Sequence, residues 1–188
     1  MNESDQDHML TGVLDALFFA AKAHKDQRRK SSGEPYVNHL IEVAQLLASL
    51  ADVQDQTTLQ SAVLHDSVED TVITGNELQE RYGSEVLKLV LQLSDDKSQP
   101  KDVRKALTVD KIGSKDPRAQ CIKIADLISN LRSLPDDWPT ERQKQYLDWA
   151  KAVRNNISVQ VPHKLDAMFL QTIEDAGEKL QSDFLLDR

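Results

Sequence analysis

The sequence predicts an all-α protein with a single domain, and three observations support this. Apolar residues recur at helical spacing along nearly the whole chain, and no run of alternating residues indicates a strand. Glycine and proline, six of each, are few for 188 residues, and aromatic residues make up only 5%. The length fits one domain that buries most of its unfolded surface without disulfide staples. We expect this domain to span residues 9–180, between a flexible N-terminus at 1–8 and a C-terminal tail at 181–188.

Three helices are predicted in the first third of the chain. The first runs from about residue 9 to 24 with an apolar stripe along one face, and the polar, basic segment 25–33 ends it. Pro35 can begin the second helix, because its missing amide donor costs nothing in a first turn. A third helix follows at about 57–68.

Capping residues mark the helices in the middle of the chain. Thr74 and Glu77 have the spacing of a capping box, at the start of a short helix that Gly83 closes. Ser84 then opens another helix, and a polar loop separates it from one at 101–109.

The last three helices are predicted by similar signals. An apolar helix at 119–134 is stopped by Pro135. Thr140 and Gln143 repeat the capping-box spacing ahead of a helix that reaches about residue 155. Pro162 lies near the start of a final amphipathic helix.

Charge and cysteine content exclude several classes of protein. The 23 Lys and Arg residues against 31 Asp and Glu give a net charge of −8, which argues against a surface that binds nucleic acid. The single cysteine, Cys121, excludes an internal disulfide framework. No apolar stretch approaches the ~20 residues that span a bilayer, and the acidic N-terminus is unlike a signal peptide. We therefore expect a soluble, cytoplasmic protein that binds neither nucleic acid nor membranes, with homo-oligomerisation left open.

Ionisable side chains crowd the segment that follows the apolar run at 62–64. If this segment is helical, His65 and Glu69 are neighbours one turn apart, as are Asp66 and Asp70. Such a group of acids repels itself without a cation, and imidazole with carboxylate suits manganese, iron or zinc better than calcium. A histidine beside a solvated aspartate is the common alternative, and the Glu-Asp pair four residues on weakens it.

A second candidate lies in the predicted helix at 119–134, where Asp126 interrupts an almost wholly apolar sequence. A buried lone carboxylate needs a partner or a metal. A salt bridge to Lys123 or Arg132 explains Asp126 as well as a metal does. Asn130, one turn further on, could share the same site.

A third candidate is basic. Three consecutive cations, Arg28, Arg29 and Lys30, precede a turn and a histidine, His39, that opens a helix. In an acidic protein this is the candidate for anion binding, although a solvated basic turn is the more common interpretation of such a run taken alone. His24 competes with His39 as a metal ligand, and the residues alone do not separate them.

Taken together, the three segments resemble the HD superfamily of metal-dependent phosphohydrolases, and more narrowly the hydrolase domain of RelA/SpoT-type alarmone enzymes. That family has a basic segment leading to a Gly-x-Pro-Tyr turn and a histidine, then His-Asp-x-x-Glu-Asp-Thr, then Lys-x-Ala-Asp-x-x-x-Asn. Here these motifs are found, in the same order and spacing, at 28–39, 65–71 and 123–130. The similarity covers roughly residues 10–173 and extends to the stand-alone, Mesh-type hydrolases.

The resemblance implies a helical HD-type bundle with one divalent metal, usually manganese, and it selects His39 over His24 as a ligand. The implied metal ligands are His39, His65, Asp66 and Asp126. Glu69 and Asp70 are implied to act on the nucleophilic water. The implied substrate contacts are Arg29 and Lys30 at the base, Asn130 at the ribose, and Lys101, Arg142 and Tyr146 at the phosphates. Leu40, Leu127 and Ser129 depart from the commoner family residues, and none of them is an implied ligand.

The substrate implied by the resemblance is guanosine 5′-diphosphate or 5′-triphosphate with a 3′-diphosphate, (p)ppGpp. Hydrolysis at the ribose 3′-oxygen would give GDP or GTP and pyrophosphate. Two alternatives stay open. One is an HD phosphohydrolase of another purine nucleotide, (p)ppApp or the 2′-phosphate of NADPH, because stacking on Arg29 recognises any purine. The other is an inactive nucleotide-binding protein, which would have no need of the water-activating acids.

Overall fold

The computed structural model describes the backbone of residues 3–186 and the side chains of residues 7–181. Within this part of the chain the all-α prediction is confirmed, since the one β-type pairing is an isolated antiparallel bridge between Arg28 and Pro35. The helices are α1 (Glu3–Ala23), α2 (Val37–Leu50), α3 (Gln56–Leu64), α4 (Ser67–Asp70), α5 (Gly75–Tyr82), α6 (Ser84–Leu93), α7 (Lys101–Lys111), a 3₁₀ turn η1 (Ile112–Ser114), α8 (Pro117–Arg132), α9 (Thr140–Asn155) and α10 (His163–Leu186).

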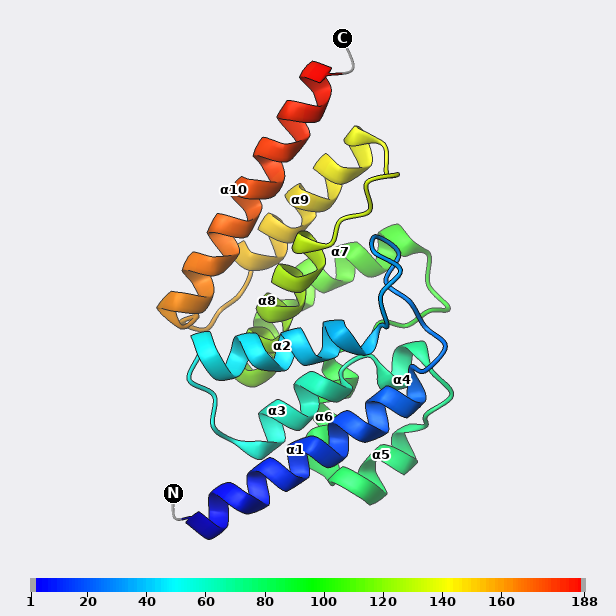
Figure 1. Ribbon diagram of the computed structural model, residues 1–188, viewed down its shortest axis with the longest axis vertical. Coiled ribbons are helices and arrows are strands. Elements are labelled where there is room, and N and C mark those ends of the chain that lie inside the picture. Colours follow the sequence, from blue (N-terminus) through cyan, green and yellow to red (C-terminus); the bar gives the residue numbers. More distant parts are fainter. Residues whose placement is uncertain (1–2, 187–188) are drawn as a thin grey trace.

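Two hydrophobic clusters hold these helices together, and α2 and α3 contribute to both. One cluster joins α2 and α3 to α8, α9 and α10, and the other joins them to α1, α5 and α6. Figure 1 shows α1 and α5 at one end of the long axis, α9 and α10 at the other, and α2 and α3 between them. Helix α8 is buried along most of its length, which explains why its sequence is apolar on nearly every face.

The helix predicted at 57–68 is wrong at its C-terminal end, over the last four residues. α3 ends at Leu64, and a separate short helix begins at Ser67. The ring nitrogen Nδ1 of His65 lies 2.8 Å from the carbonyl oxygen of Ala62. That side-chain bond takes up a carbonyl that would otherwise serve the helix, so the chain turns at His65 and Asp66.

The two capping boxes have different outcomes. At α5 the box is confirmed, because Thr74 Oγ1 accepts from the amide of Glu77 at 3.3 Å and Glu77 Oε2 accepts from the amide of Thr74 at 2.8 Å. Gly83 closes that helix with φ of 88°, in the left-handed region that favours glycine. At α9 the box is wrong: the residue before the helix is Pro139, and no side chain caps it. Thr140 already lies inside the first turn.

The first and last helices are longer than predicted. α1 begins at Glu3 rather than near residue 9, and α10 continues to Leu186. The extent of the domain, 9–180, stays a prediction. Among the described helices, none combines the length and the low polarity that crossing a bilayer requires.

Candidate active site

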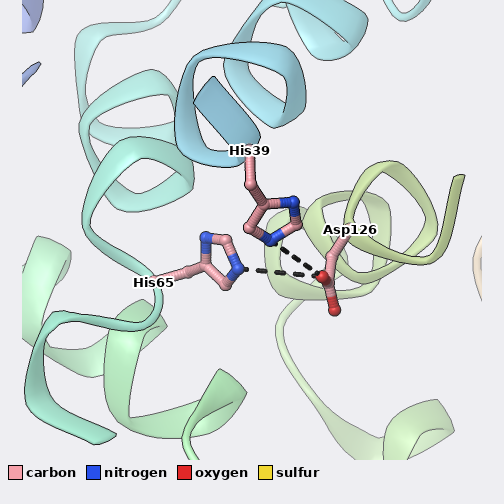
Figure 2. Close-up of side chains that lie close together, drawn as sticks. All are labelled: His39, His65 and Asp126. Carbon is pink, nitrogen blue, oxygen red and sulfur yellow. Dashed lines mark ion pairs between the residues drawn. The ribbon is translucent and has the colours of Figure 1, made fainter. Parts of the chain in front are cut away.

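Three helices bring two imidazoles and a carboxylate to one buried point. His39 lies in the first turn of α2, His65 directly follows α3, and Asp126 is in the middle of α8. Figure 2 shows the three side chains pointing toward one another. Asp126 Oδ1 lies 3.3 Å from His39 Nε2 and 3.8 Å from His65 Nε2, and the three ligand atoms all lie within 4.8 Å of one another. Segments far apart in the sequence therefore meet as the motifs predict.

The hydrogen bonds of His39 leave its Nε2 atom available to a metal. The hydroxyl of Ser129 donates its only proton to Glu42 Oε2, at 2.6 Å. The same hydroxyl lies 2.8 Å from His39 Nδ1, so it must accept a proton from that nitrogen. A neutral imidazole that donates from Nδ1 has its lone pair on Nε2. That Nε2 atom is buried and has no hydrogen-bond partner among the described residues.

His65 is held in the same tautomer by a different partner. Its Nδ1 donates to the carbonyl oxygen of Ala62, which can only accept, and its Nε2 is likewise buried without a hydrogen bond in the described part of the chain. Burial lowers the pKa of His65, but Asp66 and Asp126 outweigh burial and raise it well above the ordinary value, so a metal ion bound here would take the place of a proton on Nε2. Two aligned nitrogen donors beside carboxylates form a donor set that fits a divalent metal ion.

Asp66 lies at the edge of this group. Its Oδ2 is 3.1 Å from His65 Nε2 and 3.7 Å from His39 Nε2, and it accepts a hydrogen bond of 2.7 Å from the hydroxyl of Tyr36. Burial raises the pKa of Asp66, but the two imidazoles outweigh burial and hold it well below its usual range. Asp66 is therefore ionised and within reach of the metal position. It is not part of the tight set of three ligand atoms.

The two oxygens of Asp126 have different partners, so the predicted salt bridge to Lys123 forms and still leaves one oxygen toward the histidines. Oδ2 accepts from the buried ammonium of Lys123 at 2.8 Å. Oδ1 faces the histidines and also accepts from the side-chain amide of Asn130 at 2.5 Å. Arg132, the other proposed partner, instead pairs with Glu42 at 2.7 Å.

Glu69 lies beside the metal position, in a cavity of about 150 Å³ that His65, Asp66 and Asp126 also line. We call this the metal cavity. Glu69 Oε2 accepts from the backbone amide of Asp95 at 2.7 Å, and Glu69 Oε1 lies 3.8 Å from Arg104 Nη1. Burial, and then the charges of neighbouring carboxylates, outweigh the Asp95 amide and raise the pKa of Glu69. A raised pKa suits a carboxylate that accepts a proton near neutral pH.

Asp70 lies apart from Glu69. Its carboxylate pairs with the ammonium of Lys97, and Gln27 donates to its backbone carbonyl. It lines a larger cavity of about 290 Å³ rather than the metal cavity. We call the larger one the nucleotide cavity.

The nucleotide cavity brings together most of the implied substrate contacts. Arg29, Lys30, Asn130 and Tyr146 line it, together with Trp138. Arg29 is largely buried, and its guanidinium donates to Asn130 Oδ1 and to the carbonyl of Ser129, both at 3.0 Å, so it is fixed against α8.

Lys101 and Arg142 do not line the nucleotide cavity, but they lie next to its wall. Arg142 lies over the ring of Trp138 at 3.8 Å, and Lys101 lies 5.8 Å from the same ring. Burial and the charges of Arg142 and Lys30 lower the pKa of Lys101. Mutually repelling cations at one rim are a suitable place for phosphate groups.

His24, the alternative to His39, is outside the site, since its Nδ1 lies 2.6 Å from Gln27 Oε1 and its ring stacks on Tyr36.

Three contacts that shape the site were not predicted from the sequence. They are the Tyr36 bond to Asp66, the Ser129 bond to His39 and the Lys97 pair with Asp70. Tyr36 lies within the Gly-x-Pro-Tyr motif, so its position was a usable signal. Lys97 lies in a segment that also resembles the stand-alone hydrolases, whereas Ser129 carried no such signal.

Comparison with known proteins agrees with this geometry. The HD domain family matches residues 16–153. The guanosine-3′,5′-bis(diphosphate) 3′-pyrophosphohydrolase MESH1 of Homo sapiens is 42% identical over 146 residues, which cover 75% of this chain and 82% of the human protein. MESH1 of Drosophila melanogaster is 40% identical over 166 residues, covering 84% of this chain and 93% of the fly protein.

A solved structure is also similar over most of its length. It is described as "A metazoan ortholog of SpoT hydrolyzes ppGpp and plays a role in starvation responses", and it superposes with a TM-score of 0.83 at 36% identity, covering 88% of this chain and 96% of that one. The family match includes all three residues of the tight ligand set. The chain belongs to the HD domain family and, within it, to the RelA/SpoT-type HD hydrolases that include MESH1.

Proposed function

We propose that this protein hydrolyses guanosine 3′,5′-bis(diphosphate) and its 5′-triphosphate form at the 3′ position, releasing pyrophosphate and GDP or GTP. One observation carries the proposal: two uncommitted imidazole nitrogens and a carboxylate converge beside Glu69, in a cavity next to one with a basic wall. The names of relatives that are about 40% identical supply the substrate. An inactive binder would have no use for a raised-pKa carboxylate at this place.

The proposed metal ligands are His39, His65 and Asp126, with Asp66 as the fourth, and the proposed ion is manganese. When bound, the ion supplies Lewis-acid polarisation of a phosphoryl oxygen and a lower pKa for water. Mixed nitrogen and oxygen ligands suit this ion.

Glu69 is the proposed general base. Its carboxylate takes a proton from the attacking water, whose oxygen bonds to the phosphorus nearest the ribose as the bond from phosphorus to the 3′-oxygen breaks. The leaving 3′-oxygen takes up a proton from solvent, Glu69 returns its own proton to solvent, and pyrophosphate is released. The bond from the Asp95 amide holds Glu69 in place for this transfer. The contacts of Asp70 with Lys97 support an orienting role for Asp70, at the border with the nucleotide cavity.

The nucleoside is proposed to occupy the nucleotide cavity, with Arg29 and Lys30 at the base, Asn130 at the ribose and Tyr146 toward the phosphates. Arg29 is held by two hydrogen bonds, so it offers a rigid, planar face on which a purine can stack. Lys101 and Arg142 are proposed to neutralise the 5′-phosphates. Cations fixed in place before the substrate arrives stabilise charge without reorganising.

The test is release of pyrophosphate from guanosine 3′,5′-bis(diphosphate) by the full chain with added Mn²⁺. Parallel reactions contain the adenosine analogue, NADPH or no added metal. We expect metal-dependent release with the guanosine substrate. Faster turnover of the adenosine analogue or of the NADPH 2′-phosphate would move the proposal to those substrates. Binding of all three without turnover would favour an inactive nucleotide-binding protein.

A further inference from the structure

The metal cavity adjoins two other cavities, because it shares lining residues with each of them. It shares Tyr36 and Asn130 with the nucleotide cavity. It shares Asp95 with a third cavity, of about 190 Å³. We call this third one the lysine cavity, and it is lined by Ser94, Asp95, Asp96, Arg104, Leu107, Thr108, Lys111 and Lys115. The proposed function uses only the first two cavities.

The carboxylates of the lysine cavity already have partners. Asp95 lies 3.4 Å from both Arg104 Nη1 and Thr108 Oγ1. Asp96 Oδ1 accepts from the amide of Ser98 at 3.0 Å and from its hydroxyl at 2.7 Å. These two acids therefore have limited capacity left to neutralise further cations.

The two lysines of the same cavity lack such partners, whereas Arg104 pairs with Asp95. Neither Lys111 nor Lys115 makes an ion pair with any described side chain, and Arg104 Nε is buried without a hydrogen-bond partner there. Burial and the charge of Lys123, with a smaller effect of Lys111, outweigh the carboxylate of Asp95 and lower the pKa of Lys115. An ammonium that is half-buried beside other cations is costly unless an anion accompanies it. The lysine cavity is thus built to accept negative charge.

We propose that the lysine cavity binds the distal phosphate of the 3′-diphosphate, and so holds pyrophosphate across the metal cavity after cleavage. The inference rests on the proposed function and extends it to the leaving product. With the nucleoside in the nucleotide cavity and the reacting phosphorus in the metal cavity, the far end of the diphosphate points away from the nucleoside. Asp95 lines both the metal cavity and the lysine cavity but not the nucleotide cavity, so the lysine cavity adjoins the metal cavity at a wall that the nucleotide cavity does not share. Arg104, between Glu69 and the cavity, can contact the same phosphate.

The experiment measures the affinity of the full, Mn²⁺-loaded chain for inorganic pyrophosphate and for inorganic orthophosphate by calorimetry. Both anions reach the metal cavity, but only pyrophosphate is long enough to occupy the lysine cavity as well. We expect Lys115→Met to lower the affinity for pyrophosphate about tenfold or more. The affinity for orthophosphate should stay within about twofold of that of the unmodified chain. Lys111 is more exposed, so Lys111→Gln should weaken the affinity for pyrophosphate by roughly two- to fivefold.

The control variant is Lys164→Gln, which removes an exposed lysine on α10 outside the three cavities. It should bind both anions as the unmodified chain does. Lys115→Met should keep its melting temperature, because methionine replaces a half-buried charge with an apolar chain of similar length. Lys111→Gln provides a second test at an exposed position, where folding is not at risk.

Equal affinity of the lysine variants and the unmodified chain for pyrophosphate would overturn the inference. Equal losses for pyrophosphate and orthophosphate would overturn it too, because the cavity would then bind free phosphate rather than one end of a diphosphate. Absence of pyrophosphate binding by the unmodified chain is a third refutation. None of these results depends on hydrolysis, so failure of the proposed function shows separately, in the pyrophosphate-release assay.

Discussion

Replacing Ser129 with alanine would test how His39 is prepared for a metal. The hydroxyl of Ser129 joins α2 and α8, since it donates to Glu42 and accepts from His39 Nδ1. Alanine removes both bonds and keeps the helix. The Nδ1 proton of His39 then has no acceptor in a buried place, and its ring is free to rotate or to change tautomer. Glu42 keeps its pair with Arg132.

The expected loss of Mn²⁺ affinity in Ser129→Ala follows from two typical magnitudes that agree. A buried donor left without a partner costs about 1–3 kcal/mol. Losing the outer hydrogen bond of a metal-binding histidine typically lowers metal affinity about 10- to 100-fold, which corresponds to about 1.4–2.8 kcal/mol. We therefore expect Ser129→Ala to weaken Mn²⁺ binding by about one to two orders of magnitude.

Calorimetric titration of the metal-free chain with Mn²⁺ measures this affinity directly. The matched control is Ser61→Ala, because Ser61 is equally buried and its hydroxyl donates within α3 to the carbonyl of Thr57 at 2.7 Å. Unchanged Mn²⁺ affinity in Ser129→Ala would refute the argument that Ser129 fixes the tautomer of His39. Equal losses in both variants would point to general loosening of the core.

Three further predictions concern the ligand set, the base and the cap of α8. His65→Ala should abolish the rise in melting temperature that Mn²⁺ gives the unmodified chain, whereas His24→Ala, which removes a buried histidine outside the site, should keep that rise. Glu69→Gln should retain Mn²⁺ binding and lose about 10²- to 10⁴-fold in turnover, and turnover at the normal rate would rule out Glu69 as base. Asp116→Ala should destabilise the chain by about 1 kcal/mol in denaturant unfolding, because Asp116 caps α8 and pairs with Arg118, while Asp116→Asn should retain the cap. Hydrogen bonds from Arg118 lower the pKa of Asp116 below 3.8, so this pairing stabilises the fold fully above about pH 4 and is lost as the pH falls through the lowered pKa.

Most helices could be predicted from the sequence because their signals are local. Capping residues and apolar spacing depend on neighbours within one or two turns, and the start of α5 and the end of α8 followed them. The break at His65 depends on a side chain that turns back to Ala62 in a buried site, so spacing alone could not predict it. The capping-box spacing of Thr140 and Gln143 was misleading, because the helix already begins at Thr140, directly after Pro139.

The candidate site was predictable as a set of residue types but not as a geometry. The motifs indicated His39, His65 and Asp126, which the fold brings within reach of one another. Whether Asp126 pairs with Lys123 or faces a metal was not decidable, because a carboxylate has two oxygens and only the packed helices show that each has a different partner. The role of Ser129 in orienting His39 could not be predicted, since its partner Glu42 comes from a helix almost ninety positions earlier in the chain.

The convergence of imidazoles and carboxylates in the metal cavity has a consequence for the order in which the protein matures. The imidazoles lie against ionised Asp66 and Asp126, and Lys123 supplies one further positive charge. Lys123 therefore offsets one of the two carboxylate charges before any ion enters, and the two hydrophobic clusters pack without an ion. Small zinc domains, by contrast, stay unfolded until their ion arrives. Here the chain can complete its fold first and acquire its ion afterwards.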